Sequence, residues 1–248
     1  MANGESNFAY DPPDLDTLVK YISVERLAAY LAKTKASPER AVRLYERNTE
    51  LSEALYGVVQ AFEITLRNAI HLSLSRTHGL TWFESDLLLS GESEKESVTE
   101  AKRAIENEFE AVTPARVVAK LSLGFWVRLF SGEYDRMLWG PFFSKIFPMK
   151  LDRRAVYRRL IDIKTLRNRI AHHRRIIARS KTVAVCYDET LEAIGWLSPT
   201  VRLWVKQTNC FEERLARKFP PAKTPVPTEV QAADSPGAGQ PPPAPQPT

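Results

Sequence analysis

Residues 51–70 read LSEALYGVVQAFEITLRNAI, and the spacing of their apolar side chains decides the fold class. These side chains are Leu51, Leu55, Val58, Val59, Phe62, Leu66, Ala69 and Ile70. Intervals of three and four residues place them on one face of an α-helix, whereas a half-buried strand would alternate every second residue. We therefore expect a long amphipathic helix over about residues 50–77.

Further helices are indicated by pairs in which an N-cap side chain precedes a proline that suits the first helical turn. These pairs are Ser37-Pro38, Thr113-Pro114 and Ser198-Pro199. A second apolar stripe consists of Val156, Leu160, Ile163, Leu166 and Ile170. Strand patterns and glycine-containing hairpin turns are scarce. The expected fold is an all-α helical bundle of about seven or eight helices.

Composition divides the chain into a helical domain over residues 14–218 and two flanking segments. Ten of the seventeen Pro residues lie between Pro220 and Pro247, so residues 219–248 are expected to form a disordered tail. Residues 1–13 are expected to be flexible. Within the domain, SGESEKES at residues 90–97 and SGEYDRMLWGPFF at residues 131–143 are expected to be loops.

The overall composition excludes several classes of protein. Of the 248 residues, 44% are hydrophobic and 26% are charged, as in globular domains. No apolar run reaches the roughly 18 residues of a membrane span, so no membrane partner is expected. Cys186 and Cys210 are the only cysteines, too few for a disulfide framework or a cysteine zinc site. The start of the chain lacks the pattern of a signal peptide, and we expect a cytoplasmic protein.

Charge is unevenly distributed. Residues 150–181, here called the basic segment, hold twelve Lys and Arg against two Asp, and residues 92–110, the acidic segment, hold seven Glu against three basic residues. This asymmetry indicates either an anionic ligand at the basic segment or internal pairing of the two segments. A solvated basic helix face is the simpler alternative.

The stretch LRNRIAHHRRI, residues 166–176, lies inside the basic segment and carries groups suited to chemistry. The pKa of an unperturbed imidazole, about 6.5, suits proton transfer near neutral pH. Arginine stabilises negative charge that grows on phosphate oxygens, and asparagine can orient a reacting group. Together these groups suffice to cleave RNA without a metal or a cofactor, by attack of a 2′-hydroxyl on the adjacent phosphorus.

A helical projection of this stretch, taken as one helix, separates the two histidines. His172 lies about 180° from the centre of the apolar stripe, whereas His173 lies at its edge. His172 is thus the better catalytic candidate and His173 the better structural one. Arg167 lies about 140° from His172, so either the helix distorts or a second copy of the helix completes the site across a dimer axis. A shared zinc ion at His172 and His173 is disfavoured, because adjacent helical residues diverge and no third ligand follows at a familiar spacing.

Arg167-Asn168-x-x-x-His172 resembles the motif of the HEPN superfamily (higher eukaryotes and prokaryotes nucleotide-binding). The longer stretch LRNRIAHHRRI is similar to the motif region of its Abi-like, abortive-infection branch. The resemblance extends to ISVERLAAYL at residues 22–31, to residues 41–48 and 51–70, and to LSLGFWVRLF at residues 121–130. It covers roughly residues 20–200.

The resemblance implies a HEPN fold, a homodimer and a metal-independent endoribonuclease of abortive-infection or toxin type that acts on RNA, with tRNA as one possible substrate. It carries the catalytic pair over to Arg167 and His172, and the polar partner over to Asn168. Such a toxin implies an antitoxin, of protein or RNA. The alternative is a non-catalytic RNA-binding or adaptor protein that uses the basic segment alone.

Other residues are candidates for supporting the site or binding RNA. Glu63, Arg67 and His71 form one polar line at intervals of four residues, which either faces the motif helix or forms a surface ion pair of small value. The resemblance includes Glu63 and Arg67, whereas His71 is taken as incidental. Four residues of the motif region complete the set: Arg169, His173, Arg174 and Arg175.

Overall fold

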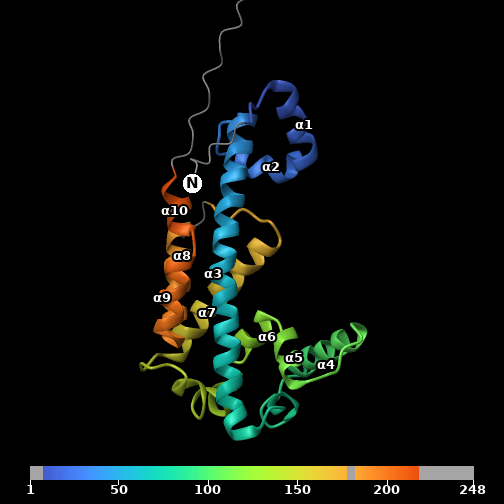
Figure 1. Ribbon diagram of the computed structural model, residues 1–248, viewed down its shortest axis with the longest axis vertical. Coiled ribbons are helices and arrows are strands. Elements are labelled where there is room, and N and C mark those ends of the chain that lie inside the picture. Colours follow the sequence, from blue (N-terminus) through green and yellow to red (C-terminus); the bar gives the residue numbers. More distant parts are fainter. Residues whose placement is uncertain (1–7, 178–181, 218–248) are drawn as a thin grey trace, which may run out of the picture.

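The computed structural model of the protein describes residues 8–177 and 182–217. In these residues the fold is all-α, with ten α-helices and no strand, which confirms the predicted fold class (Figure 1). The α-helices are α1 (Pro12–Ile22), α2 (Val24–Leu31), α3 (Pro38–His78), α4 (Glu92–Asn107), α5 (Pro114–Lys120), α6 (Leu123–Arg128), α7 (Arg153–Ala171), α8 (Val183–Leu197), α9 (Pro199–Thr208) and α10 (Phe211–Ala216). The number exceeds the expected seven or eight because several helices, such as α6 and α10 with six residues each, are too short to show a period. The tail expected at residues 219–248 lies outside the described residues.

Helix α3 is the central element, and its 41 residues span about 60 Å. Ser37 caps the first turn by accepting a hydrogen bond from the backbone N–H of Arg40, and Pro38 occupies that turn. Gly79, with φ 78°, ends the helix in a conformation that suits glycine. The helix start predicted at Ser37 and the helix predicted over about residues 50–77 are therefore parts of one continuous helix.

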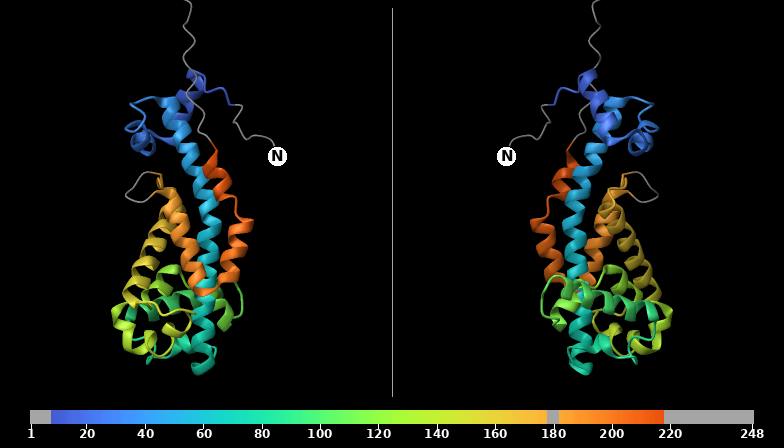
Figure 2. Two further views of the ribbon diagram at one scale, coloured as in Figure 1. Left: turned by 90° about the vertical axis from the view of Figure 1, so that its left-hand side faces the viewer. Right: turned by 90° about the vertical axis from the view of Figure 1, so that its right-hand side faces the viewer.

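The main hydrophobic core lies along α3 from Leu51 onward and includes the whole predicted apolar stripe except Ala69. Figures 1 and 2 show α7, α8, α9 and α10 alongside α3, and α8 makes the most extensive contact with it. Within the described residues, no helix is both long and apolar enough to cross a membrane.

A second, smaller core lies at the N-terminal end of α3, where α1 and α2 pack on its first turns. We call residues 8–45 the N-terminal lobe; its buried apolar residues are Tyr10, Leu27, Tyr30, Ala41 and Val42. The Tyr10 hydroxyl donates to Glu46, and the Arg43 guanidinium lies 4.1 Å from the centre of the Tyr10 ring. Within residues 1–13, expected to be flexible, the structure thus gives Tyr10 a buried position and begins α1 at Pro12. Residues 1–7 lie outside the described residues.

The remaining local predictions had mixed outcomes. The helix starts at Thr113 and Ser198 are confirmed, since both hydroxyls accept a first-turn N–H. The loop expected at residues 90–97 is wrong, because α4 begins at Glu92 and buries Val98 and Ile105, about two and four turns further on. Residues 131–143 contain no α-helix, only short 3₁₀ and π turns.

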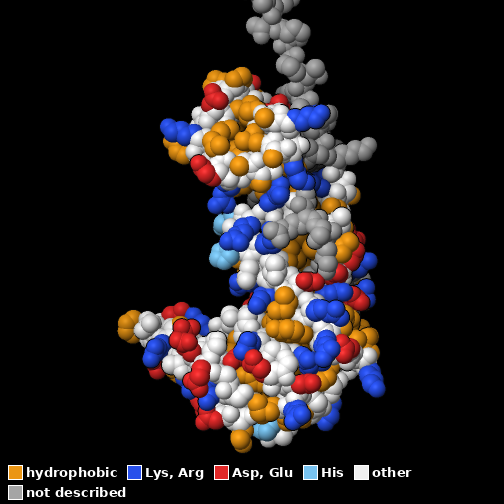
Figure 3. All heavy atoms as spheres, turned by 180° about the vertical axis from the view of Figure 1, so that it is seen from behind, with side chains coloured by type: hydrophobic (Ala, Val, Ile, Leu, Met, Phe, Trp, Pro, Cys, Tyr) orange, Lys and Arg blue, Asp and Glu red, His pale blue; other side chains and the backbone are white. Residues whose placement is uncertain are grey.

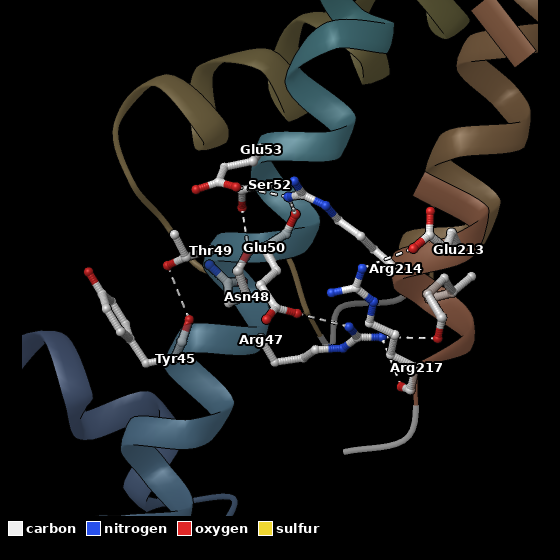
Figure 4. A network of polar contacts seen from close by, with 11 residues as sticks. Tyr45, Arg47, Asn48, Thr49, Glu50, Ser52, Glu53, Glu213, Arg214 and Arg217 are labelled. Carbon is white, nitrogen blue, oxygen red and sulfur yellow. Dashed lines mark hydrogen bonds and ion pairs between the residues drawn. The ribbon is translucent and has the colours of Figure 1, made fainter. Parts of the chain in front are cut away.

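The last helix, α10, is fastened to α3 by a polar network, shown in Figure 4. Arg47 donates from Nη2 to the carbonyl oxygens of Leu215 and Arg217, at 3.0 and 3.3 Å. Arg214 donates to the Glu50 carbonyl and to the Glu53 carboxylate, each at 2.8 Å. The Arg47 contacts satisfy carbonyls at the C-terminal end of α10, which its own backbone leaves unpaired, and the Arg214 contacts join α10 to α3.

The two charged segments do not pair with each other in the described residues. The acidic segment pairs with nearby cations: Glu94 with Arg128, Glu108 with Lys120 and Glu110 with Arg116. The basic segment pairs elsewhere: Arg153 with Asp135, Arg159 with Glu192 and Arg167 with Glu63. The ion pairs of the described residues therefore do not support the alternative in which the acidic and basic segments pair with each other.

Candidate functional site

Helix α7 carries the motif and is fixed from its apolar side. Asp152 caps its first turn by accepting from the backbone N–H of Ala155 at 2.9 Å. The whole predicted stripe is buried: Val156, Leu160, Ile163, Leu166 and Ile170. This burial determines the rotation of α7 about its axis, and thus which side the polar motif residues occupy.

Helix α7 ends within the motif rather than after it. The backbone N–H of Arg174 bonds the carbonyl of Arg169 at 2.7 Å, and that of His173 bonds the carbonyl of Ile170 at 3.0 Å. This pair of bonds is the Schellman C-cap, in which the residue after the cap takes a left-handed conformation; here that residue is His173, with φ 52°. The expectation that residues 166–176 lie on one helix is wrong beyond Ala171.

The two histidines consequently lie in a loop, residues 172–177, here called the motif loop. His172 is the C-cap residue, with φ −97° and ψ 18°, and its side chain is exposed as predicted. His173 is exposed as well, so its predicted position at the edge of the core is wrong. The left-handed backbone turns its side chain away from the direction that a continued helix would give.

Arg167 is oriented by α3. Its Nε lies 3.7 Å from Oε2 of Glu63, and 37% of the Arg167 side chain and 22% of the Glu63 side chain are exposed. This ion pair agrees with the interpretation in which Glu63 faces the motif helix. Within the described residues, no hydrogen bond or ion pair joins Arg167 to His172, as the 140° separation led us to expect.

The other residues of the predicted polar line point to different neighbours. Arg67 donates to the carbonyl of Ala119 in α5 at 3.3 Å. His71 accepts at Nδ1 from the indole N–H of Trp82 at 3.0 Å, and burial lowers the pKa of His71. Among the ion pairs and hydrogen bonds of the described residues, Glu63 is the member of this line that contacts the motif.

Contacts with α2 and α3 hold the motif loop in place. Arg26 in α2 donates to the carbonyl of His173 at 3.2 Å, and Arg175 donates to the carbonyl of Ala29 at 2.7 Å. The Arg175 guanidinium also lies 5.9 Å from the centre of the Tyr30 ring. Arg175 is therefore engaged by the N-terminal lobe.

From α3, the buried Asn48 accepts hydrogen bonds from the backbone N–H groups of Ile176 and Ile177. Sequence reasoning assigned no role to Asn48 or to Arg26. A signal for Asn48 was present, since it precedes Leu51 by three residues and Leu55 by seven, on the apolar side of α3. A polar residue on a buried stripe needs a hydrogen-bonding partner.

The remaining candidates differ in exposure. Asn168 and Arg174 are exposed, whereas Arg169 is half-buried. Figure 3 shows His, Lys and Arg side chains together at the waist of the molecule, on its hollowed side between the N-terminal lobe and the projecting α4–α5 pair. This surface therefore presents imidazole and guanidinium groups to a polyanion that binds there.

The polar side chains of the candidate site are mainly those of histidine and arginine. Among the described residues, no group of three or more His, Cys, Asp or Glu side chains is placed to hold a metal ion. Imidazole and guanidinium groups can move a proton and stabilise phosphate charge by themselves.

No family model, no curated protein and no solved structure matches this chain.

Proposed function

We propose that the protein is a metal-independent endoribonuclease of the abortive-infection or toxin type. The observation that carries the proposal is the position of His172, exposed at the end of α7, beyond an Arg167 that Glu63 orients. Arg167 and His172 are five residues apart, which corresponds to about 7.5 Å along the axis of α7. The exposed His172, His173 and Arg174 at the end of α7 support a nucleic-acid substrate.

In the proposed reaction, His172 accepts the proton of a ribose 2′-hydroxyl. The 2′-oxygen attacks the adjacent phosphorus, the bond to the 5′-oxygen breaks, and that oxygen takes up a proton. Arg167 stabilises the negative charge of the phosphorane, and Asn168 orients the ribose or the phosphate. The products are a 2′,3′-cyclic phosphate and a 5′-hydroxyl.

We further propose that the working unit is a homodimer. Arg167 and His172 lie about 140° apart around α7, and a two-fold axis would place the Arg167 of one copy near the His172 of the other. The further proposed partners are cellular RNA, such as tRNA, and an antitoxin that restrains the enzyme. The proposed site of action is the cytoplasm.

The test is cleavage of a defined RNA by the purified chain in excess EDTA. We expect a 2′,3′-cyclic phosphate, or the phosphate that forms when it opens, on the 5′ fragment. A matched substrate with a single 2′-deoxyribose at the cut should stay intact, because the nucleophile is missing. Arg167→Ala and His172→Ala should each lower the rate by about 10² to 10⁴. A requirement for metal, or full activity in His172→Ala, would contradict the mechanism.

One observation favours the second candidate, a non-catalytic RNA-binding or adaptor protein: Arg167 is paired with Glu63 and makes no contact with His172 in the single chain. Both candidates predict binding that weakens with salt, with a log–log slope that falls by about 0.7 to 0.9 when Arg174→Ala removes one phosphate contact. Arg76→Ala, at an exposed residue near the end of α3 and outside the basic segment, is the matched control. Salt-dependent binding by a chain that cleaves no RNA would favour the adaptor.

A further inference from the structure

The motif loop is joined to α3 by one buried side chain. Oδ1 of Asn48 accepts hydrogen bonds from the backbone N–H of Ile176 at 2.7 Å and of Ile177 at 3.2 Å. Asn48 is 4% exposed, and Ile176 is buried in the main core. These bonds therefore form where water has little access.

The chemistry of the contact specifies an acceptor at position 48. Both partners are backbone N–H donors, so the oxygen of the amide must face the loop. Residues 176 and 177 follow the end of α7 and belong to no helix, so these donors have no intrahelical acceptor. A buried N–H without a partner is costly, and an apolar residue at position 48 would leave two of them unsatisfied.

Helix α3 thus contacts both parts of the motif. Glu63 lies beside Arg167, and Asn48 binds the chain a few residues beyond His172. Fifteen residues of helix separate Glu63 from Asn48, which is about 22 Å. Because α7 runs antiparallel to α3, these two contacts bracket the end of α7 where His172 lies (Figure 2).

We propose that Asn48 is a positioning residue that fixes the loop carrying His172, and so sets the place of His172 relative to Arg167. The catalytic part of this inference rests on the proposed ribonuclease function. Figure 4 shows Asn48 in the turn of α3 next to the Arg47 network, which joins a different helix, α10.

The two contacts from α2 have a different character. Arg26 with the His173 carbonyl and Arg175 with the Ala29 carbonyl are both exposed interactions between a guanidinium and a backbone oxygen. Water can replace either partner at small cost. Of the contacts to the loop, the buried one from Asn48 is therefore expected to dominate its position.

The experiment compares Asn48→Leu, Asn48→Asp and a matched control, Asn209→Leu. Asn209 is a half-buried asparagine on another side of α3, where it accepts from the Phe211 N–H and donates to the Ala54 carbonyl, both at 2.8 Å. In Asn48→Leu, we expect faster amide hydrogen exchange at Ile176 and Ile177 than in the wild type, with the amides of α7 unchanged. In cleavage of the defined RNA, kcat should fall by about 10²-fold with KM nearly constant, as for a misplaced catalytic group.

Asn48→Asp retains the acceptor and should restore both the slow exchange and most of kcat. Asn209→Leu should lower the melting temperature and leave kcat and loop exchange unchanged. If Asn48→Leu does not fold, Asn48→Ala, which leaves room for water, should show the same changes in smaller measure.

Unchanged exchange at Ile176 and Ile177 in the Asn48 variants would overturn the proposal, and so would faster exchange with unchanged kcat. An equal loss of kcat in Asn209→Leu and Asn48→Leu would show that the loss follows from lower overall stability, and this would also overturn the proposal. If the wild-type chain cleaves no RNA, the proposed function fails, while the exchange measurement still decides whether Asn48 fixes the loop.

Discussion

Glu63 and Arg167 face each other across the contact of α3 with α7, with Oε2 of Glu63 3.7 Å from Nε of Arg167. This separation is too long for a hydrogen bond, so the carboxylate of Glu63 does not accept a hydrogen bond from the Arg167 guanidinium. Because the pair is partly exposed, it contributes only about 0–1 kcal/mol to stability. We infer that its main effect is on the direction in which Arg167 points.

Replacing Glu63 should therefore change activity more than stability. In Glu63→Gln, we expect RNA cleavage to slow by about tenfold as Arg167 loses its orienting charge, with a stability change under about 1 kcal/mol. Glu192→Gln is the matched control. It removes a carboxylate of α8 that pairs at 2.7 Å with Arg159, which lies in α7 as Arg167 does. Equal rates for Glu63→Gln and Glu192→Gln would show that Glu63 does not orient Arg167.

Mixtures of two inactive variants should recover activity if the site is shared between copies. If the chain is a homodimer, mixing Arg167→Ala chains with His172→Ala chains would give mixed dimers, in which one of two sites keeps both groups. Cleavage should appear on mixing and increase with dimer formation, followed by sedimentation. Full activity of the wild-type chain as a monomer would contradict the shared site.

His173→Gly should stabilise the protein. The left-handed conformation costs an L-residue about 1–2 kcal/mol, and the extra freedom of glycine in the unfolded chain costs about 0.5–1 kcal/mol, so a gain of up to about 1.5 kcal/mol is expected. Chemical denaturation measures the change. His173→Val should have the opposite sign, because a branched side chain fits this conformation poorly. A lower stability of His173→Gly would mean that contacts of the imidazole stabilise the fold by more than the left-handed conformation costs.

Stability should fall in mild acid through His71. Burial lowers the pKa of His71 in the folded state, so the unfolded chain binds more protons once the pH drops below about the ordinary value of 6.5. The stability associated with the neutral imidazole is therefore fully present above that pH and is lost as the pH falls. Protonation of Nδ1 would also remove the acceptor for Trp82.

Melting temperatures measured from pH 7.5 to 5 should decline in the wild type and decline less in His71→Gln, which does not titrate. His78→Gln, at an exposed position near the end of α3, is the control and should follow the wild type. Parallel curves for the wild type and His71→Gln would exclude His71 as the cause.

The sequence predicted the features that depend on local pattern. The apolar stripe from Val156 to Ile170 predicted α7 and the face that it buries, and Ser37, Thr113 and Ser198 predicted helix starts. The exposure of His172 also followed from this rotation. Residues 90–97 were misjudged because polar, glycine-containing sequence suits a helix N-terminus as well as a loop.

Contacts between distant residues were not predictable in the same way. Asn48 and Ile176 are separated by 128 residues, and no period or spacing connects them. The position of Tyr10 in the N-terminal lobe likewise depends on Arg43 and Glu46, which the first residues of the chain do not reveal.

By itself, the sequence determined that the chain is all-α and that Arg167 belongs to an amphipathic helix whose apolar stripe runs from Val156 to Ile170. Only the tertiary structure decided that this helix ends at Ala171, so that His172 lies at its end and His173 in a turn. Local spacing alone would allow the helix to continue. It ends because the chain beyond it gains the burial of Ile176 in the main core and two hydrogen bonds to Asn48, and both require α3 to be in place.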